Sequence, residues 1–358
     1  MAAAGLRHVA ALAGVSIKTV SNVINDYPYI APETRAKVEE AIRQLDYRPN
    51  LYARSLRGGR SGVIALAIPT IDAPYFAEIG RSVARAAQRR GWTVYIDQTD
   101  GDPQQELAAI KGLGPHLIDG LIFSPLTLGP ADLANQQIAR PVVMLGERSV
   151  NGTADHVAID NIRAARVATT HLIETGRRRI AAIGDQPHVA TNTARLRVAG
   201  YRAALAEAGL AADSALLKQP TAYTREEGAK AMHELLALPQ PPDAVFCFTD
   251  LLAIGAMRAV HDYGLRVPDD IAVMGFDDIA EGRFSVPSLS TIAPDKDQLA
   301  EAAVSLLERR LGATSVLAAE EVEITFELAV RESTGSGTPA RSMPAASPRH
   351  KQRGVPLS

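Results

Sequence analysis

The stretch LRHVAALAGVSIKTVSNVIN, residues 6–25, predicts two helices joined by a tight turn. Apolar residues in its first half recur every three or four positions, which gives a helix one apolar stripe. Gly14 then allows the left-handed backbone that ends a helix, and Ser16 is a good N-cap for the next one. The sequence therefore predicts a helical hairpin whose halves pack through apolar faces.

The second helix of this hairpin has one apolar and one polar face. The apolar face carries Val20, Val23 and Ile24, and the other face carries Lys18, Ser21, Asn22 and Asn25. Amide, hydroxyl and ammonium groups on the first turns of a helix suit hydrogen bonding to base edges in the DNA major groove. An ordinary helical hairpin with a solvated face has the same pattern, so the pattern alone leaves both interpretations open.

Longer motifs point to a family. The segments AGVSIKTVSNVIN (13–25), PETRAKVEEAIRQLDYRPN (32–50) and ARSL (53–56) closely resemble the N-terminus of the lac repressor/galactose repressor family of bacterial transcription regulators. The similarity continues to VREST, near Arg331. The resemblance implies a helix-turn-helix DNA-binding domain over 1–49 and a hinge helix with its linker over 50–60.

The resemblance also implies which residues contact DNA. They are Ser16, Ile17, Lys18, Thr19, Ser21, Asn22, Asn25, Tyr47, Asn50, Ala53, Arg54 and Leu56. Leu56 would wedge into the minor groove when paired hinge helices form on the operator, although a plain interdomain linker is the alternative. Gly5 and His8 replace the polar cap and the acid that most relatives carry, which predicts a weak cap on the first helix.

Composition and charge agree with a soluble DNA-binding protein. The chain has 358 residues, 46% of them hydrophobic and 22% charged, enough for two or three globular domains. Residues 1–60 hold nine Lys/Arg against five Asp/Glu, whereas the whole chain has a net charge of -2. A basic head on an acidic body suits phosphate binding by the head. With no apolar run of about 20 residues and no signal-peptide layout, we expect a cytoplasmic protein. Its single cysteine, Cys247, excludes an internal disulfide.

From Gly62 onward, short apolar runs alternate with amphipathic helices. GVIALAIP, WTVYIDQT, DGLIFSP and PVVMLGE read as parallel strands, with helices over 74–90, 103–117 and 131–139, and a second set begins at Asn161. Two such sets predict two doubly wound parallel-sheet lobes, a core that the family shares with periplasmic sugar-binding proteins. The expected N-terminal lobe is 61–160 with 291–320, the expected C-terminal lobe is 161–290 with 321–333, and 334–358 is expected to be a disordered tail.

Ligands in doubly wound folds bind at the carboxyl ends of strands, so we expect an effector between the lobes. Carboxylates accept bonds from hydroxyls, arginine donates as a fork, and an aromatic ring covers an apolar face. The predicted effector-binding residues are Asp72, Tyr75, Phe76, Ser124, Arg148, Thr193, Arg197, Tyr223, Thr249 and Asp277. The resemblance ranks Arg197 and Asp277 first. Helix caps at Asp160 and Asp278, and an ion pair at Arg148, are structural alternatives.

The sequence thus predicts a repressor that binds a palindromic operator as a homodimer and is released by a small-molecule effector, with a sugar as the expected class. A purine- or nucleoside-responsive, corepressor-dependent regulator is the alternative. A solute-binding receptor would need a signal peptide and would leave residues 1–60 unexplained. We expect neither an enzyme nor a bound cofactor or metal, because no nucleotide-binding glycine motif and no His/Cys cluster with metal spacing occurs. No membrane partner is expected.

Overall fold

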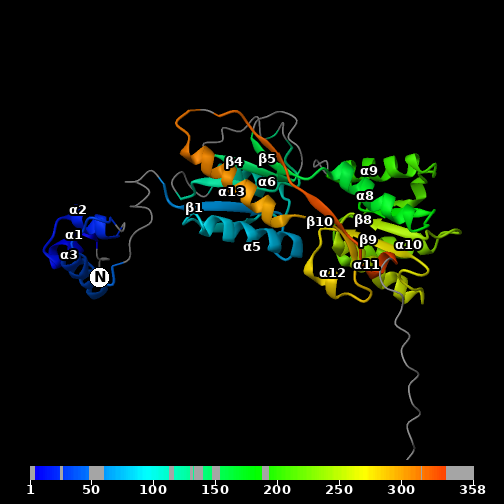
Figure 1. Ribbon diagram of the computed structural model, residues 1–358, viewed down its shortest axis with the longest axis horizontal. Helices are drawn as coiled ribbons and strands as arrows, with labels where there is room; N and C mark the ends of the chain where they lie inside the picture. The colour runs from blue at the N-terminus through cyan, green and yellow to red at the C-terminus, as the bar shows by residue number, and fades with distance from the viewer. Residues whose placement is uncertain are drawn as a thin grey trace, which may run out of the picture. The chain divides into compact units, whose positions relative to one another are not determined.

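The computed structural model describes residues 5–24, 27–47, 60–112, 117–129, 132, 140–146, 154–187, 193–315 and 317–335. The chain divides into two compact units, one of Met1–Val157 with Leu299–Val322 and one of Ala158–Gln298 with Glu323–Ser358. Figure 1 shows a helical head, which belongs to the first unit, and a β-sheet with its helices in each unit. The predicted hinge over 50–59, most of the predicted helix 131–139 and the tail after Gly335 lie outside the described residues. Within the described ranges, none of the helices combines the length and the apolarity that a membrane crossing requires.

Three helices form the head: α1 (Leu6–Ala13), α2 (Ile17–Ile24) and α3 (Pro32–Gln44). Gly14 takes the predicted left-handed conformation, with φ 66° and ψ 31°. The predicted N-cap of α2 is also present, because the Thr19 backbone N–H donates to Ser16 Oγ at 3.1 Å. Apolar side chains of all three helices share one small core, made of Val9, Ala10, Val20, Val23, Val38, Ala41 and Tyr47.

The first sheet has six strands in the order β11-β5-β4-β3-β1-β2. They are β1 (Val63–Ile68), β2 (Thr93–Gln98), β3 (Gly120–Phe123), β4 (Val142–Gly146), β5 (Asp155–Ala158) and β11 (Glu321–Glu323). Its helices are α5 (Pro74–Gln88), α6 (Pro103–Lys111) and most of α13 (Lys296–Gly312). The central strands β1 and β3 are parallel and almost wholly buried, which explains their unbroken apolar sequences.

The second sheet has the order β12-β10-β9-β8-β6-β7. Its strands are β6 (Ile180–Ile183), β7 (Leu217–Lys218), β8 (Ala244–Cys247), β9 (Ala272–Phe276), β10 (Ser290–Pro294) and β12 (Phe326–Ala329), and its helices are α8 (Asn161–Glu174), α9 (Thr193–Glu207), α10 (Arg225–Leu236), α11 (Asp250–Asp262) and α12 (Ala280–Phe284). Two short 3-10 turns span Ser214–Leu216 and Glu332–Thr334.

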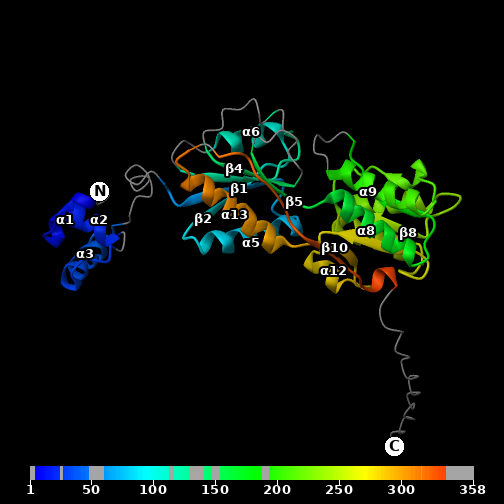
Figure 2. The ribbon, with the colours of Figure 1, turned by 45° about the horizontal axis from the view of Figure 1, so that its top comes forward.

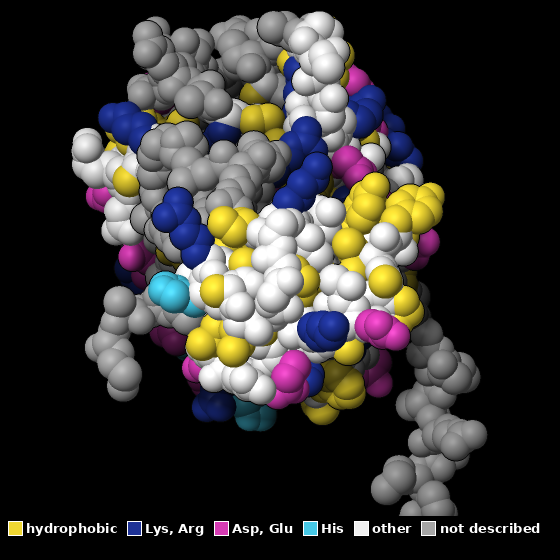
Figure 3. Space-filling model, turned by 90° about the vertical axis from the view of Figure 1, so that its left-hand side faces the viewer, with side chains coloured by type: hydrophobic (Ala, Val, Ile, Leu, Met, Phe, Trp, Pro, Cys, Tyr) yellow, Lys and Arg dark blue, Asp and Glu magenta, His cyan; other side chains and the backbone are white. Residues whose placement is uncertain are grey.

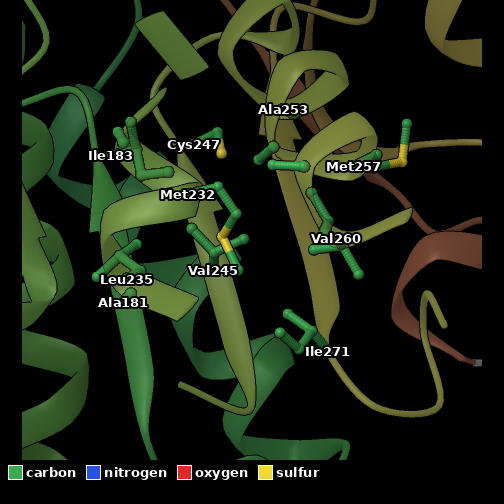
Figure 4. Close-up of a cluster of buried hydrophobic side chains, with 14 of the residues drawn as sticks. Ala181, Ile183, Met232, Leu235, Val245, Cys247, Ala253, Met257, Val260 and Ile271 are labelled. Carbon is green, nitrogen blue, oxygen red and sulfur yellow. The ribbon is translucent and has the colours of Figure 1, made fainter. Parts of the chain in front are cut away.

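Close packing explains the small residues of the second unit. Figure 2 shows α8 and α9 side by side, and a Cβ added at Gly200 of α9 would lie 2.2 Å from the carbonyl oxygen of Ile162 in α8. Helices α10 and α11 pack on the sheet through the apolar cluster in Figure 4, where Met232 and Val260 lie near Val245 of β8. Cys247 of β8 also belongs to this cluster, and burial raises the pKa of its thiol.

The strand pairing corrects the expected lobe boundaries. Strand β10 pairs with β9 and β12, so residues 291–298 belong to the second unit, and the chain enters the first unit again within α13. Conversely, β11 lies beside β5 in the first sheet, although 321–333 was expected in the C-terminal lobe. Between α9 and α10, the 3-10 turn Ser214–Leu216 leads into β7, which is only two residues long. Periodicity identifies a strand but does not say which sheet edge it joins, so these assignments needed tertiary structure.

Candidate DNA-reading and effector-binding sites

Helix α2 presents an outer face that agrees with the predicted reading surface. Val20 and Val23 point into the head core. Around them, Ser16, Ile17 and Lys18 are exposed, and Thr19, Ser21 and Asn22 are half-buried. Figure 3 faces the side of the molecule that carries the head, and it shows hydrophobic, Lys or Arg, and Asp or Glu side chains scattered among backbone and other side chains. The chemistry of this face suits direct contacts to base edges and thymine methyl groups.

Other predicted DNA contacts have different outcomes. Tyr47 is only 9% exposed, because its ring packs in the apolar core of the head. The prediction that its side chain contacts DNA is therefore not supported. Asn25, Asn50, Ala53, Arg54 and Leu56 lie outside the described residues. The sequence prediction missed a pair of exposed rings after α2, Tyr27 and Tyr29, whose centroids are 5.6 Å apart. Their hydroxyl groups can donate to phosphate oxygens.

The start of α1 has a better cap than the sequence predicted. The backbone N–H of Gly5 donates to His8 Nδ1 at 2.9 Å. The imidazole thereby takes the place of the carboxylate of a capping box. A ring nitrogen that carries no hydrogen can accept this bond.

In the first unit, four predicted effector residues lie at the carboxyl ends of neighbouring strands. Asp72 and the first-turn residues of α5, Tyr75 and Phe76, follow β1, and Ser124 follows β3, where its N–H donates to the Ala67 carbonyl at 2.9 Å. The two rings form an edge-to-face pair with centroids 5.3 Å apart. Arg148 lies outside the described residues.

A buried carboxylate that the sequence analysis overlooked supports this edge. Glu106 of α6 is fully buried, and its oxygens accept bonds from the backbone N–H groups of Leu126, Thr127 and Leu128 at 2.6–3.3 Å and from the Thr127 hydroxyl at 2.7 Å. These bonds hold the loop that continues from Ser124. The sequence gives no signal for this role of Glu106, because its position among the helical residues resembles that of an exposed acid.

In the second unit, Arg197 of α9 lies under the carboxyl ends of β8 and β9. It is 8% exposed. Its Nε donates to Asn161 Oδ1 at 2.9 Å, and Nη1 donates to the Phe248 carbonyl. The guanidinium carbon lies 3.4 Å from the centre of the Phe276 ring. Stacking and two donated bonds fix the orientation of this cation.

Asp277 follows Phe276 directly and is 7% exposed. Its φ is 117° and that of Asp278 is 49°, which are unusual conformations for residues with a Cβ. Asp250, fully buried at the start of α11, accepts bonds from the Ile279 N–H at 2.9 Å and from the Thr291 hydroxyl at 2.7 Å. These contacts hold the strained turn in place. The sequence analysis did not identify Asp250 as a supporting residue.

The remaining predicted residues of this unit lie at the same edge of the sheet. Thr193 begins α9, and Thr249 caps α11, where its Oγ1 accepts the Leu252 N–H at 3.3 Å. Tyr223 donates its hydroxyl hydrogen to the Gly184 carbonyl at 2.7 Å. Two further groups at this edge were missed: Asn161, the partner of Arg197, and Asp185, which is 8% exposed after β6. The strand-end rule could have found Asp185.

Two residues with structural alternatives can now be assigned. Asp160 caps α8 by accepting the Arg163 N–H at 2.9 Å, as the structural interpretation predicted. Asp278 instead forms ion pairs with Arg283 and with Arg331, the latter at 2.5 Å. Burial alone would raise the pKa of Asp278, but hydrogen bonds from the two guanidinium groups bring it below its usual value.

Known proteins match both parts of this architecture. Residues 5–50 match the family described as bacterial regulatory proteins, lacI family, and residues 169–334 match a periplasmic binding protein-like domain. The HTH-type transcriptional repressor PurR of Haemophilus influenzae (strain PittEE) is 35% identical over 337 residues, which cover 93% of this chain and 99% of the relative. The chain belongs to the lacI family. The predicted family is therefore confirmed.

Solved structures of lacI-family regulators share the fold. A complex of the transcriptional regulator CelR with cellobiose has a TM-score of 0.69 and 31% identity, and a lac repressor dimer bound to operator and the anti-inducer ONPF has a TM-score of 0.80 and 26% identity. Each comparison covers 92% of this chain and 99% of the other. The predicted helical head and two-sheet core are confirmed by this likeness.

Proposed function

We propose that this lacI-family protein is a transcription repressor that binds a palindromic operator as a homodimer. The observation that carries the proposal is the outer face of α2, which offers Lys18, Ser21 and Asn22 from a fixed three-helix head. Two heads related by a two-fold axis read two half-sites of opposite orientation, which makes the operator a palindrome. A repressor acts on chromosomal DNA, so we place it in the cytoplasm and assign it no catalytic activity.

We further propose that a sugar bound at the strand ends of the core releases the repressor. Asp277 and Arg197 supply an acceptor and a cation beside the Phe276 ring, a set that suits adjacent hydroxyl groups on an apolar ring face. The cellobiose bound to the related regulator CelR is consistent with this class of ligand.

A purine is the second candidate, and one observation favours it. The Tyr75–Phe76 pair at the end of β1 offers aromatic surface on which a flat base could stack, and PurR is a relative across nearly the whole chain. A purine corepressor would strengthen operator binding, whereas a sugar inducer would weaken it. The sign of the response separates the two candidates.

Selection of duplexes from a randomised DNA pool tests the proposal. We expect a palindrome whose capture survives moderate salt, because base contacts add to the phosphate contacts that salt weakens. The selected duplex is then titrated with the protein in the presence of cellobiose, lactose, hypoxanthine or guanine. Weakening by a sugar supports the inducer, and strengthening by a purine supports the corepressor. The selection is repeated with hypoxanthine or guanine present, and selection of no sequence under either condition would contradict a sequence-specific repressor.

A further inference from the structure

One carboxylate binds the residues that directly precede β1 of the first sheet. Asp119 lies immediately before β3, and its Oδ1 accepts bonds from the Ser61 N–H at 2.7 Å and the Ser61 hydroxyl at 3.0 Å. Its Oδ2 accepts the N–H of Gly62 at 2.7 Å. Ser61 is only 7% exposed. Three short bonds to an ionised group make this a strong local anchor, which we call the Asp119 clamp.

The second sheet repeats this device. Asp243 lies immediately before β8, and its two oxygens accept the N–H groups of Arg178 at 2.8 Å and Arg179 at 3.0 Å, just ahead of β6. The acid of each sheet also donates its own N–H to the strand it anchors, from Asp119 to Val63 at 2.8 Å and from Asp243 to Arg179 at 3.0 Å. The two clamps are structural equivalents.

The chain segments that lead into the two clamps differ. The Asp243 clamp receives the chain from α8 of the same unit, whereas the Asp119 clamp receives it from residues 48–59, which connect the head to the core. Arg60 adds a third attachment, because its guanidinium donates to the Leu311 carbonyl near the end of α13. The first residues after the connection are thus fixed to two elements of the first unit.

Gly62 makes this anchor necessary. Its φ is 75°, a region that glycine enters freely, and no other group lies within 4 Å of the position where a Cβ would stand. The Gly62 carbonyl accepts the Thr93 N–H at 2.9 Å, which holds the side of the residue that faces β1. Without a partner for its N–H, the backbone on the other side of this glycine could still rotate. The bond from Gly62 to Asp119 removes that freedom.

We infer that Asp119 is a positioning residue for operator binding. It fixes the point and direction in which the chain leaves the core toward the DNA-binding head; we call the head with its connecting residues the DNA-binding arm. This inference rests on the proposed function as a dimeric repressor. Once one head has bound its half-site, the second binds at an effective concentration that depends on how stiffly both arms are held. A loose joint lowers that concentration while leaving the reading surface of each head intact.

The test compares D119N with the matched control D243N. Asparagine is nearly isosteric, but its Nδ2 cannot accept an N–H, so each variant loses one backbone bond at an equivalent place. Fluorescence anisotropy would measure binding to the palindrome that the wild-type protein selects and to a duplex carrying one half-site. We expect D119N to bind the palindrome about fivefold more weakly or worse, with half-site affinity within about twofold of wild type. For D243N both affinities should match wild type.

Each other outcome is decisive. Equal loss of palindrome affinity in both variants, or no loss in D119N, overturns the positioning role. Parallel loss of half-site affinity also overturns it, because that pattern reports damage to the head. If D119N does not fold, Ser61→Ala provides the test, since it removes only hydroxyl bonds and should give a smaller loss of the same kind. A wild-type protein that selects no palindrome would contradict the proposed function instead.

Discussion

Replacing Asp250 tests how the turn at Asp277 is held. The Asp250 side chain is fully buried, and burial followed by the charge of Asp277 raises the pKa of its carboxyl well above the usual range. An acid with a raised pKa in the folded state contributes most to stability below its unfolded pKa, about 3.9. That contribution is lost as pH rises through the folded pKa. Ionisation of Asp250 as the pH rises therefore lowers the stability of the second unit.

Asparagine can keep both hydrogen bonds without the charge. Its Oδ1 can accept the Ile279 N–H, and its Nδ2 can donate to Thr291 Oγ1, whose own hydrogen can then point to the Ile292 carbonyl 3.2 Å away. Alanine removes the acceptor of the buried Ile279 N–H, at a cost of about 1–3 kcal/mol, whereas the Thr291 hydroxyl can still donate to the Ile292 carbonyl. We therefore expect Asp250→Asn to be more stable than Asp250→Ala by about 2 kcal/mol, a gap of roughly 4–8 °C in Tm for a unit of this size.

Thermal unfolding followed by circular dichroism at pH 4 and pH 8 measures these differences. At pH 8 the Tm of Asp250→Asn should equal or exceed that of the wild type. At pH 4, where the wild-type carboxyl is protonated more readily, this difference in Tm should be smaller. Asp269→Asn is the control, because Asp269 is 61% exposed and forms only a surface pair with Arg266. If Asp250→Asn melts clearly below wild type at pH 8, the buried carboxylate stabilises the fold as an anion and the reasoning is refuted.

Further predictions concern DNA reading, the effector and pH. Lys18→Ala should change the selected operator sequence, whereas Lys37→Ala on exposed α3 should not; a uniform loss over all sequences would limit Lys18 to phosphate contact. Leu56→Ala should weaken palindrome binding and reduce DNA bending measured by gel mobility, and unchanged affinity would reject the wedge. Asp277→Ala should abolish the effector response in the operator titration while sparing DNA binding; a normal response would remove it from the site. Burial lowers the pKa of His171, which contacts Thr334 Oγ1 at 2.9 Å. Since the unfolded histidine then binds protons more readily, stability should decrease below about pH 6.5, and His171→Gln should flatten that decrease in urea unfolding.

The sequence alone determined the features that depend on neighbours along the chain. The left-handed Gly14, the Ser16 cap and the apolar stripe of α2 follow from local backbone preference and helical period. The two sets of strands and helices followed from alternating apolar runs, and the strand-end rule located Asp277 and Ser124 at the proper edges of their sheets. The helix-capping role of Asp160 could also be predicted, because an N-cap depends only on residues next to it in the sequence.

Tertiary structure decided everything that depends on which distant segments meet. The pairing of β10 with β12 and of β11 with β5 is a choice among sheet edges, and no period in the sequence encodes that choice. The burial of Tyr47 depends on contacts with two other helices. Glu106, Asp119 and Asp250 look like ordinary acids in the sequence, because their partners lie 20 to 58 residues away. Glu106 and Asp250 are fully buried and Asp119 is half-buried, and each accepts several hydrogen bonds, because a carboxyl group taken out of water costs free energy unless it is hydrogen-bonded. This burial exists only in the folded chain.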